Sequence, residues 1–209
     1  MRRRSFSPRA SALAAATVLA ACASQPPTRF HTLMPSAPSA RAPTAAGERV
    51  PAVLEPIRLP VQVDQPQWLV RLPDDTVAVL EQERWASPLR DELRQALREA
   101  LITTWGMTEE RPAAGANAPV RISIDVRRFD SLISGEARIA GSWTLVSSQS
   151  PTASVRCEWV VGERTASDVP SLAAAHRRAV ARLAAGIGQN LGRVSRGEPV
   201  SCPAPESDA

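Results

Sequence analysis

Few residues in this 209-residue chain have the types that carry out chemistry: it contains three cysteines and two histidines. Neither His31 nor His176 lies near a serine or cysteine in a known nucleophile motif, and no C-x-x-C, H-E-x-x-H, P-loop or G-x-G-x-x-G pattern is present. Every basic residue is arginine, which excludes a lysine nucleophile. We therefore predict a protein that is not an enzyme and that uses no cofactor or metal. His176 is predicted to be a packed helix residue.

Cys22 is the cysteine with the clearest chemical context. It follows Leu19-Ala20-Ala21 at the end of an apolar run, which itself follows four arginines. A basic region, an apolar region and a small-residue cleavage site are typical of a secretory signal, and the cysteine directly after the cut resembles the lipobox of bacterial lipoproteins. The resemblance implies that residues 1–21 are removed and that Cys22 is acylated. Two or more acyl chains hold a protein on a membrane without a transmembrane helix.

The residues after Cys22 predict the membrane and the charge of the mature chain. Ala23 and Ser24 follow it without an aspartate, which in Gram-negative lipoproteins implies the periplasmic face of the outer membrane. Cleavage removes four of the 25 arginines and no acidic residue, and so leaves 21 basic against 21 acidic side chains. Because this neutral chain has no electrostatic reason to bind nucleic acid, we predict none as a partner.

The other two cysteines leave two alternatives open. Cys157 and Cys202 would lie in an oxidising compartment, where disulfides persist. A disulfide between them would stabilise the fold by about 4 kcal/mol in the chain-entropy model. Otherwise Cys157 is a small buried apolar residue and Cys202 is a free thiol near the end of the chain.

Composition divides the mature chain into three parts. Residues 22–49 are rich in Pro, Ala, Ser and Thr, which is typical of a tether, and contain one short predicted strand near residues 29–33. Residues 50–196 are predicted to form the folded domain. Residues 197–209 are polar and Pro-rich, which predicts a disordered tail.

Alternating apolar residues predict the strands of the domain. The predicted strands cover residues 53–63, 67–71, 76–80, 120–126, 139–145 and 155–161. Pro56 and Pro60 mark the first as an edge or bulged strand, because proline cannot donate to a sheet ladder. The second and third flank a Pro-Asp turn and predict a hairpin, and the last three predict an antiparallel meander. Residues 107–119 are predicted to form a loop.

Two segments have apolar residues at helical spacing. In the first, Ser87 is predicted to be the N-cap, Pro88 the first helical residue, and Gly106 the end. The second covers residues 170–194, with Asp168 as its cap. Each helix has a single apolar stripe, so the expected fold is α+β. It would be a two-layer sandwich in which both helices cover one face of a mainly antiparallel sheet.

A candidate partner interface surrounds the predicted hairpin. Trp68 lies in a short strand that could be an edge, where an exposed aromatic would suit a protein interface, although core packing is the alternative. Arg84 could pair with Glu81 or Glu83, or its long side chain could simply pack at the helix entry. The candidate interface residues are Trp68, Arg71, Arg84 and Trp85.

Four segments of the sequence can be compared with a known family. They are Phe30-His31-Thr32-Leu33, the strand around Trp68-Leu69-Val70-Arg71, Glu83-Arg84-Trp85-Ala86-Ser87-Pro88-Leu89, and Val126-Arg127-Arg128-Phe129-Asp130. Together they resemble the ABC-type transport auxiliary lipoprotein family, whose type member is paraquat-inducible protein C. The resemblance covers roughly residues 29–195, and the chain departs from it at Gln65, where arginine is common.

The resemblance implies a role in the cell envelope. Family members are non-catalytic outer-membrane lipoproteins that work with an MCE-domain protein and inner-membrane transport components to move lipids between membranes, and the type member forms a homo-oligomeric ring. We therefore expect an adaptor of an MCE-type lipid-transport system that supports envelope integrity. The alternative is a periplasmic lipoprotein that itself binds a lipid or another ligand.

Overall fold

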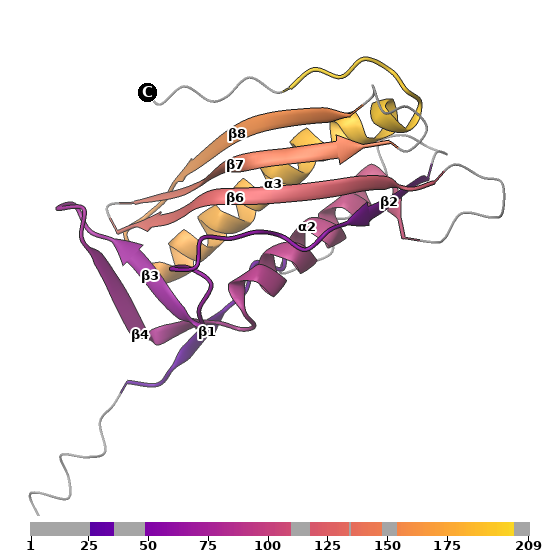
Figure 1. The fold of residues 1–209 in the computed structure, drawn as a ribbon. Helices are drawn as coiled ribbons and strands as arrows, with labels where there is room; N and C mark the ends of the chain where they lie inside the picture. The colour runs from indigo at the N-terminus through magenta and orange to yellow at the C-terminus, as the bar shows by residue number, and fades with distance from the viewer. Residues whose placement is uncertain (1–25, 36–48, 110–117, 134, 148–153, 203–209) are drawn as a thin grey trace, which may run out of the picture.

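The computed structural model describes residues 26–35, 49–109, 118–133, 135–147 and 154–202. The predicted signal peptide and Cys22 lie outside these residues, as do residues 36–48 of the predicted tether and residues 203–209 of the predicted tail. The described residues form an α+β fold with one eight-stranded sheet, and helices α2 (Leu89–Trp105) and α3 (Val169–Ser195) cover one of its faces (Figure 1).

The long strand β6 (Val120–Leu132) is the centre of the sheet. One edge of β6 pairs antiparallel with β7 (Glu136–Val146), and β7 pairs antiparallel with β8 (Val155–Arg164). The predicted meander is therefore present, and each of its strands is longer than the apolar pattern predicted. A bulge lies between Val126 and Arg128, opposite Gly141.

The other edge of β6 is shared by two strands. β2 (Val50–Leu54) runs parallel to the first residues of β6, and β3 (Gln67–Arg71) runs parallel to it at Leu132. β5 (Met107–Thr108) pairs in parallel with the start of β2, inside the segment predicted to be a loop. The sheet is therefore mixed and curled, and the prediction of a mainly antiparallel sheet is wrong.

The strand predicted over residues 53–63 is shorter and begins earlier. The predicted apolar face is wrong, because Val53 is 43% exposed and the buried residues of β2 are Val50, Ala52 and Leu54. β2 ends at Leu54 because Pro56 cannot donate to the ladder. The chain still follows β6 as far as Arg58, whose N–H donates to the carbonyl of Ile124 at 3.1 Å. Of the predicted apolar residues past the end of the strand, Ile57 is buried, Leu59 and Val63 are partly buried, and Val61 is exposed.

The predicted hairpin consists of β3 and the longer strand β4 (Val77–Trp85), which pair antiparallel. The pairing of β3 with β4 has a bulge between Gln67 and Trp68, and beyond it residues 83–85 of β4 pair in parallel with β1 (Arg29–His31). The strand predicted inside the tether is therefore part of the sheet, and Leu33 directly after it is buried in the core.

Of the three helix-end residues predicted from the sequence, Asp168 and Gly106 are confirmed and Ser87 is wrong. Asp168 caps α3 by accepting from the N–H of Ser171 at 2.8 Å, and Gly106 ends α2 with a φ of 71°. Ser87 does not cap α2. Pro88 occupies the N-cap position, while the N–H and hydroxyl of Ser87 both donate to the carboxylate of Glu92.

Helices α2 and α3 contact each other closely near their C-terminal ends. A Cβ atom built on Gly188 of α3 would lie 2.1 Å from the indole of Trp105 at the end of α2. The glycine therefore allows the tryptophan ring to lie directly against the backbone of α3, which explains a helix-weakening residue in this place.

Candidate functional site

Two of the four predicted interface residues, Trp68 and Trp85, lie in the core. Their rings stack with centroids 4.1 Å apart, and the residues are only 1% and 4% exposed. His31 meets Trp68 edge-on at a centroid distance of 5.3 Å. Trp68 is therefore packed in the core and is not an exposed edge residue. In this conformation a partner could not contact either indole.

The other two, Arg71 and Arg84, lie on the opposite face of the same strands. Arg71 is opposite Val77 in the strand register, and Arg84 is opposite both Phe30 and Gln67. Directly opposite residues share a face of a sheet, so all of them face away from the stacked tryptophans. We call this surface the hairpin face, and its residues are Phe30, Gln67, Leu69, Arg71, Val77, Val79 and Arg84.

The hairpin face is unusually apolar for a solvent-facing surface. Phe30 is 66% exposed, and Val77 and Val79 are 52% and 45% exposed. These residues were not among the predicted site residues. A signal was present in the sequence, because Val77 to Leu80 are four consecutive apolar residues, and a strand with one wet face should alternate.

Ion pairs around β1 hold its residues in place. The carboxylate of Glu83 is buried and lies 2.6 Å from both the Arg29 guanidinium and His31 Nε2. Arg84 therefore does not pair with Glu83, and its Nε donates to the backbone carbonyl of Glu81 at 3.4 Å. Arg71 Nη2 lies 3.4 Å from the carboxylate of Asp130 on β6.

Hydrogen bonds to Glu92 connect the segment after β1 to the rest of the domain. Its buried carboxylate accepts hydrogen bonds from the Thr32 hydroxyl at 2.6 Å and the Leu33 N–H at 2.9 Å, in addition to both groups of Ser87. The carboxylate also lies in the first turn of α2, where the helix dipole favours negative charge. One side chain thus joins β1, the end of β4 and the start of α2.

His176 and Ser131 form a serine–histidine pair that is sealed inside the core. His176 Nε2 and Ser131 Oγ are 2.8 Å apart, and the imidazole stacks on Phe129 with centroids 4.1 Å apart. Burial lowers the pKa of His176 from 6.5 to about 3, so its ring is neutral at physiological pH. Among the described residues no third group orients Nδ1, which has no hydrogen-bond partner there. This pair is therefore structural, and His176 is the packed helix residue that the sequence predicts.

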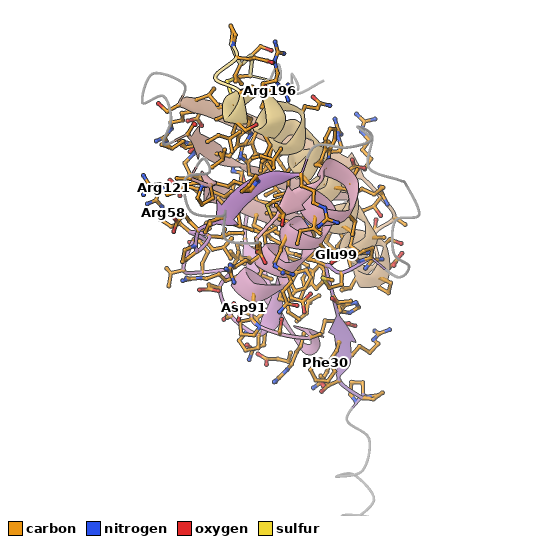
Figure 2. All side chains as sticks on the ribbon, turned by 90° about the vertical axis from the view of Figure 1, so that its right-hand side faces the viewer. Phe30, Arg58, Asp91, Glu99, Arg121 and Arg196 are labelled. Atoms are coloured by element: carbon orange, nitrogen blue, oxygen red, sulfur yellow. A yellow bond between two sulfur atoms is a disulfide. The ribbon has the colours of Figure 1, made fainter. Side chains whose placement is uncertain are left out.

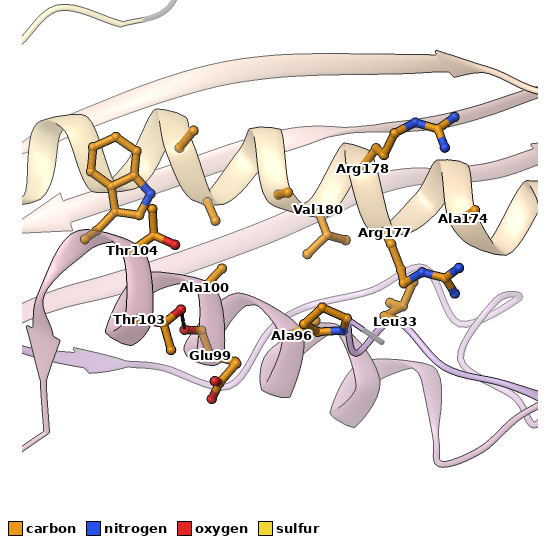
Figure 3. A pocket seen from close by; sticks show the side chains of 15 residues that line it. Leu33, Ala96, Glu99, Ala100, Thr103, Thr104, Ala174, Arg177, Arg178 and Val180 are labelled. Carbon is orange, nitrogen blue, oxygen red and sulfur yellow. Dashed lines mark hydrogen bonds between the residues drawn. The ribbon is translucent and has the colours of Figure 1, made fainter. Parts of the chain in front are cut away.

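A groove of about 600 Å³ lies between α2 and α3, on the side of the helices away from the sheet (Figure 3). Its floor consists mainly of small residues, and they include Ala96, Ala100, Ala181 and Ala184. Arg177 lies at one end, where its guanidinium donates to the carbonyl of Thr32 at 3.1 Å and has no carboxylate partner among the described residues.

The structure joins Cys157 on β8 to Cys202 by a disulfide. Glu198 pairs with Arg196, and Val200 packs against the core. Residues 197–202, which the composition assigns to a disordered tail, are therefore tied to β8.

Two further properties of the described residues limit what they can do. They contain no group of three or more His, Cys, Asp or Glu side chains arranged to hold a metal ion. Neither of their helices combines the length and the apolar composition that a membrane span requires.

The described residues have the fold of a small α+β domain that is also found in two solved structures of similar proteins. One is a protein of the family DUF330 from Xanthomonas campestris, with 22% identity, a TM-score of 0.56, and coverage of 76% of this chain and 95% of that one. The other is an uncharacterized protein with 16% identity, a TM-score of 0.51, and coverage of 82% and 98%. At these identities the likeness shows the fold alone.

The family model for the ABC-type transport auxiliary lipoprotein component matches residues 31–188, most of the chain. The protein therefore belongs to this family, as the sequence resemblance implied. A comparison with curated proteins found no match. The family is one of lipoproteins that serve as auxiliary transport components, which fits a protein that is not an enzyme.

Proposed function

We propose that this protein is an outer-membrane lipoprotein that serves as the adaptor of an MCE-type lipid-transport system, and that it works as a homo-oligomeric ring. The observation that carries the proposal is the family match over residues 31–188, together with the lipobox at Cys22. An acylated Cys22 anchors the chain to the periplasmic face of the membrane. The domain supplies a surface for an MCE-domain protein and inner-membrane components, with no catalytic step.

The anchor is tested by the variant Cys22→Ala. Mature wild-type protein should fractionate with the outer membrane and resist a salt wash, and mass spectrometry should find acyl chains on its first residue. The variant should leave the outer-membrane fraction. A variant that stays in that fraction after the washes, or a native amino terminus without acyl chains, contradicts the proposal.

The adaptor role is tested by purification of the native lipoprotein in detergent. An MCE-domain protein should co-purify, and native mass spectrometry should detect a homo-oligomer. A detergent-stable anchored protein that never retains an MCE-domain partner would contradict the role.

The groove between α2 and α3 favours a second candidate, a lipoprotein that itself carries a lipid. An apolar floor would suit one acyl chain, and Arg177 at the end would suit an anionic headgroup. Protein expressed without the anchor should then co-purify with lipid, and Ala100→Trp, which fills the groove, should abolish this. Wild-type protein that is free of lipid by mass spectrometry would refute the candidate and leave the adaptor role intact.

A further inference from the structure

The hairpin face contains a cluster of exposed large apolar side chains in the described part of the chain. Of the five large apolar side chains that are exposed there, Phe30, Val77 and Val79 lie on this face. Such a cluster on a sheet surface usually marks a contact with another molecule or with a membrane. Figure 2 shows Phe30 at one extreme end of the molecule and Arg196 near the other end.

The length of the chain before β1 indicates what lies against this face. Phe30 comes only eight residues after Cys22, and eight residues span at most about 28 Å even when fully extended. Because β1 is paired with β4 and Leu33 is buried, the chain cannot gain further reach from residues 29–33. An acylated Cys22 would therefore hold Phe30, and the hairpin face around it, within about 28 Å of the bilayer surface.

The chemistry of the face suits a lipid surface. An aromatic ring and two valines provide apolar area, and Arg84 lies directly across from Phe30 in the strand register. The Arg84 guanidinium bonds only a backbone carbonyl and has no carboxylate partner among the described residues, so its charge is available to a phosphate. Apolar residues flanked by arginine are the pattern of peripheral membrane contacts.

We propose that the hairpin face lies on the bilayer in which Cys22 is anchored. Phe30, Val77 and Val79 then contact the boundary between headgroups and acyl chains, and Arg84 contacts a lipid phosphate. This inference rests on the proposed function, because it requires the acyl anchor. It goes further by fixing how the domain is oriented on its membrane, with the helix layer and its groove on the side away from this contact.

The test uses the full acylated chain in vesicles of phosphatidylethanolamine and phosphatidylglycerol, with or without brominated acyl chains, which quench nearby indoles. Phe30→Trp and Val79→Trp each add one reporter to the hairpin face. Arg121→Trp is the matched control, because Arg121 is exposed on the same face of the sheet but far from the hairpin. Leu132 is the residue of β6 that pairs with Arg71 of the hairpin face, and Arg121 lies eleven residues before it, or roughly 35 Å along β6. Flotation reports the anchor in every sample, and circular dichroism reports the fold.

The emission added at residues 30 and 79 should fall roughly twofold in brominated vesicles, because an indole at the headgroup boundary lies within about 10 Å of the bromines. Emission from Arg121→Trp should change no more than that of the wild type. If the protein floats but neither hairpin reporter is quenched, the inference is wrong, while the acyl anchor is supported. The hairpin face would then be available to a protein partner. Equal quenching of all three reporters also overturns the inference. Failure to float overturns the anchor and the inference together.

Discussion

Acidification should destabilise this domain through one buried histidine. His176 is 0% exposed, and burial lowers its pKa to about 3 from the ordinary value of 6.5. Between these two values the unfolded chain binds a proton that the folded protein does not, so the free energy of unfolding decreases as the pH falls. The loss begins near pH 6.5 and should reach about 2 kcal/mol at pH 5, because each unit costs 1.36 kcal/mol.

The surroundings of the ring explain why the proton is excluded. His176 Nε2 shares a hydrogen bond with the Ser131 hydroxyl, and Nδ1 faces a buried region without an acceptor. A protonated ring would therefore carry a charge buried away from water, and its Nδ1–H would have no hydrogen-bond partner among the described residues. Neither cost arises in the unfolded chain.

The measurement is urea unfolding of the mature protein, followed by tryptophan fluorescence at several pH values between 7.5 and 5. The control is the double variant His176→Phe, Ser131→Ala, which removes the titrating group and its hydroxyl partner together. The free energy of unfolding of the wild type should fall by about 2 kcal/mol more than that of the double variant between pH 7.5 and 5. Equal losses in the two proteins would refute the reasoning, since His31 and all carboxylates are common to both.

Three further substitutions test individual contacts. Cys202→Ser should lower the free energy of unfolding by about 4 kcal/mol, because it opens the loop closed with Cys157, and reducing agent should then have no further effect. Glu92→Gln should cost about 2–3 kcal/mol in urea unfolding, because an amide offers one acceptor oxygen to four donors. Gly188→Ala should cost about 1–3 kcal/mol, measured by thermal unfolding, because its Cβ would collide with Trp105.

Each of these substitutions has a matched comparison. Wild type in reducing agent should be as unstable as Cys202→Ser, and a difference between them would contradict the disulfide. Asp91→Asn, at an exposed position in the same first turn of α2, should cost much less than Glu92→Gln. Gly188→Ala combined with Trp105→Ala should be less destabilised than the sum of the two single variants, and strict additivity would contradict the contact.

The regular elements could be predicted from the sequence because their signals are local. Both helices, the hairpin and the strands of the meander follow from the spacing of apolar residues, and Asp168 and Gly106 were identifiable as helix ends. Parallel pairing could not be predicted in this way. The contact of β1 with β4 joins residues more than fifty positions apart, and no local pattern specifies it.

Two of the four candidate interface residues lie in the core and two on the surface, for a reason that lies in the sequence itself. Trp68 and Arg71 are three residues apart on a strand, and Arg84 and Trp85 are neighbours, so side-chain alternation puts each pair on opposite faces. The tryptophans belong to the core and the arginines to the hairpin face. Alternation applied to the four residues together would have separated them, because a single face of a sheet cannot contain adjacent residues.

Glu92 shows where local reasoning stops. An acidic residue in the first turn of a helix is explained by the helix dipole alone, and the sequence offers no reason to look for more. Two of its hydrogen-bond partners, Thr32 and Leu33, come from a segment with the composition of a tether. The role of Glu92 therefore depends on a contact between the predicted short strand near residues 29–33 and α2, which no local pattern specifies.

The docking of β1 changes how far the domain can extend from its membrane. If residues 22–49 were all free, the folded part would begin at Val50, up to about 95 Å from the acylated cysteine. Because β1 is in the sheet and Glu92 holds Leu33, only the seven steps from Cys22 to Arg29 remain, or at most about 25 Å. In the proposed function, an adaptor with so short a connection to an acylated Cys22 works beside its own bilayer. A component that starts in the opposite membrane must therefore extend across the periplasm to meet it.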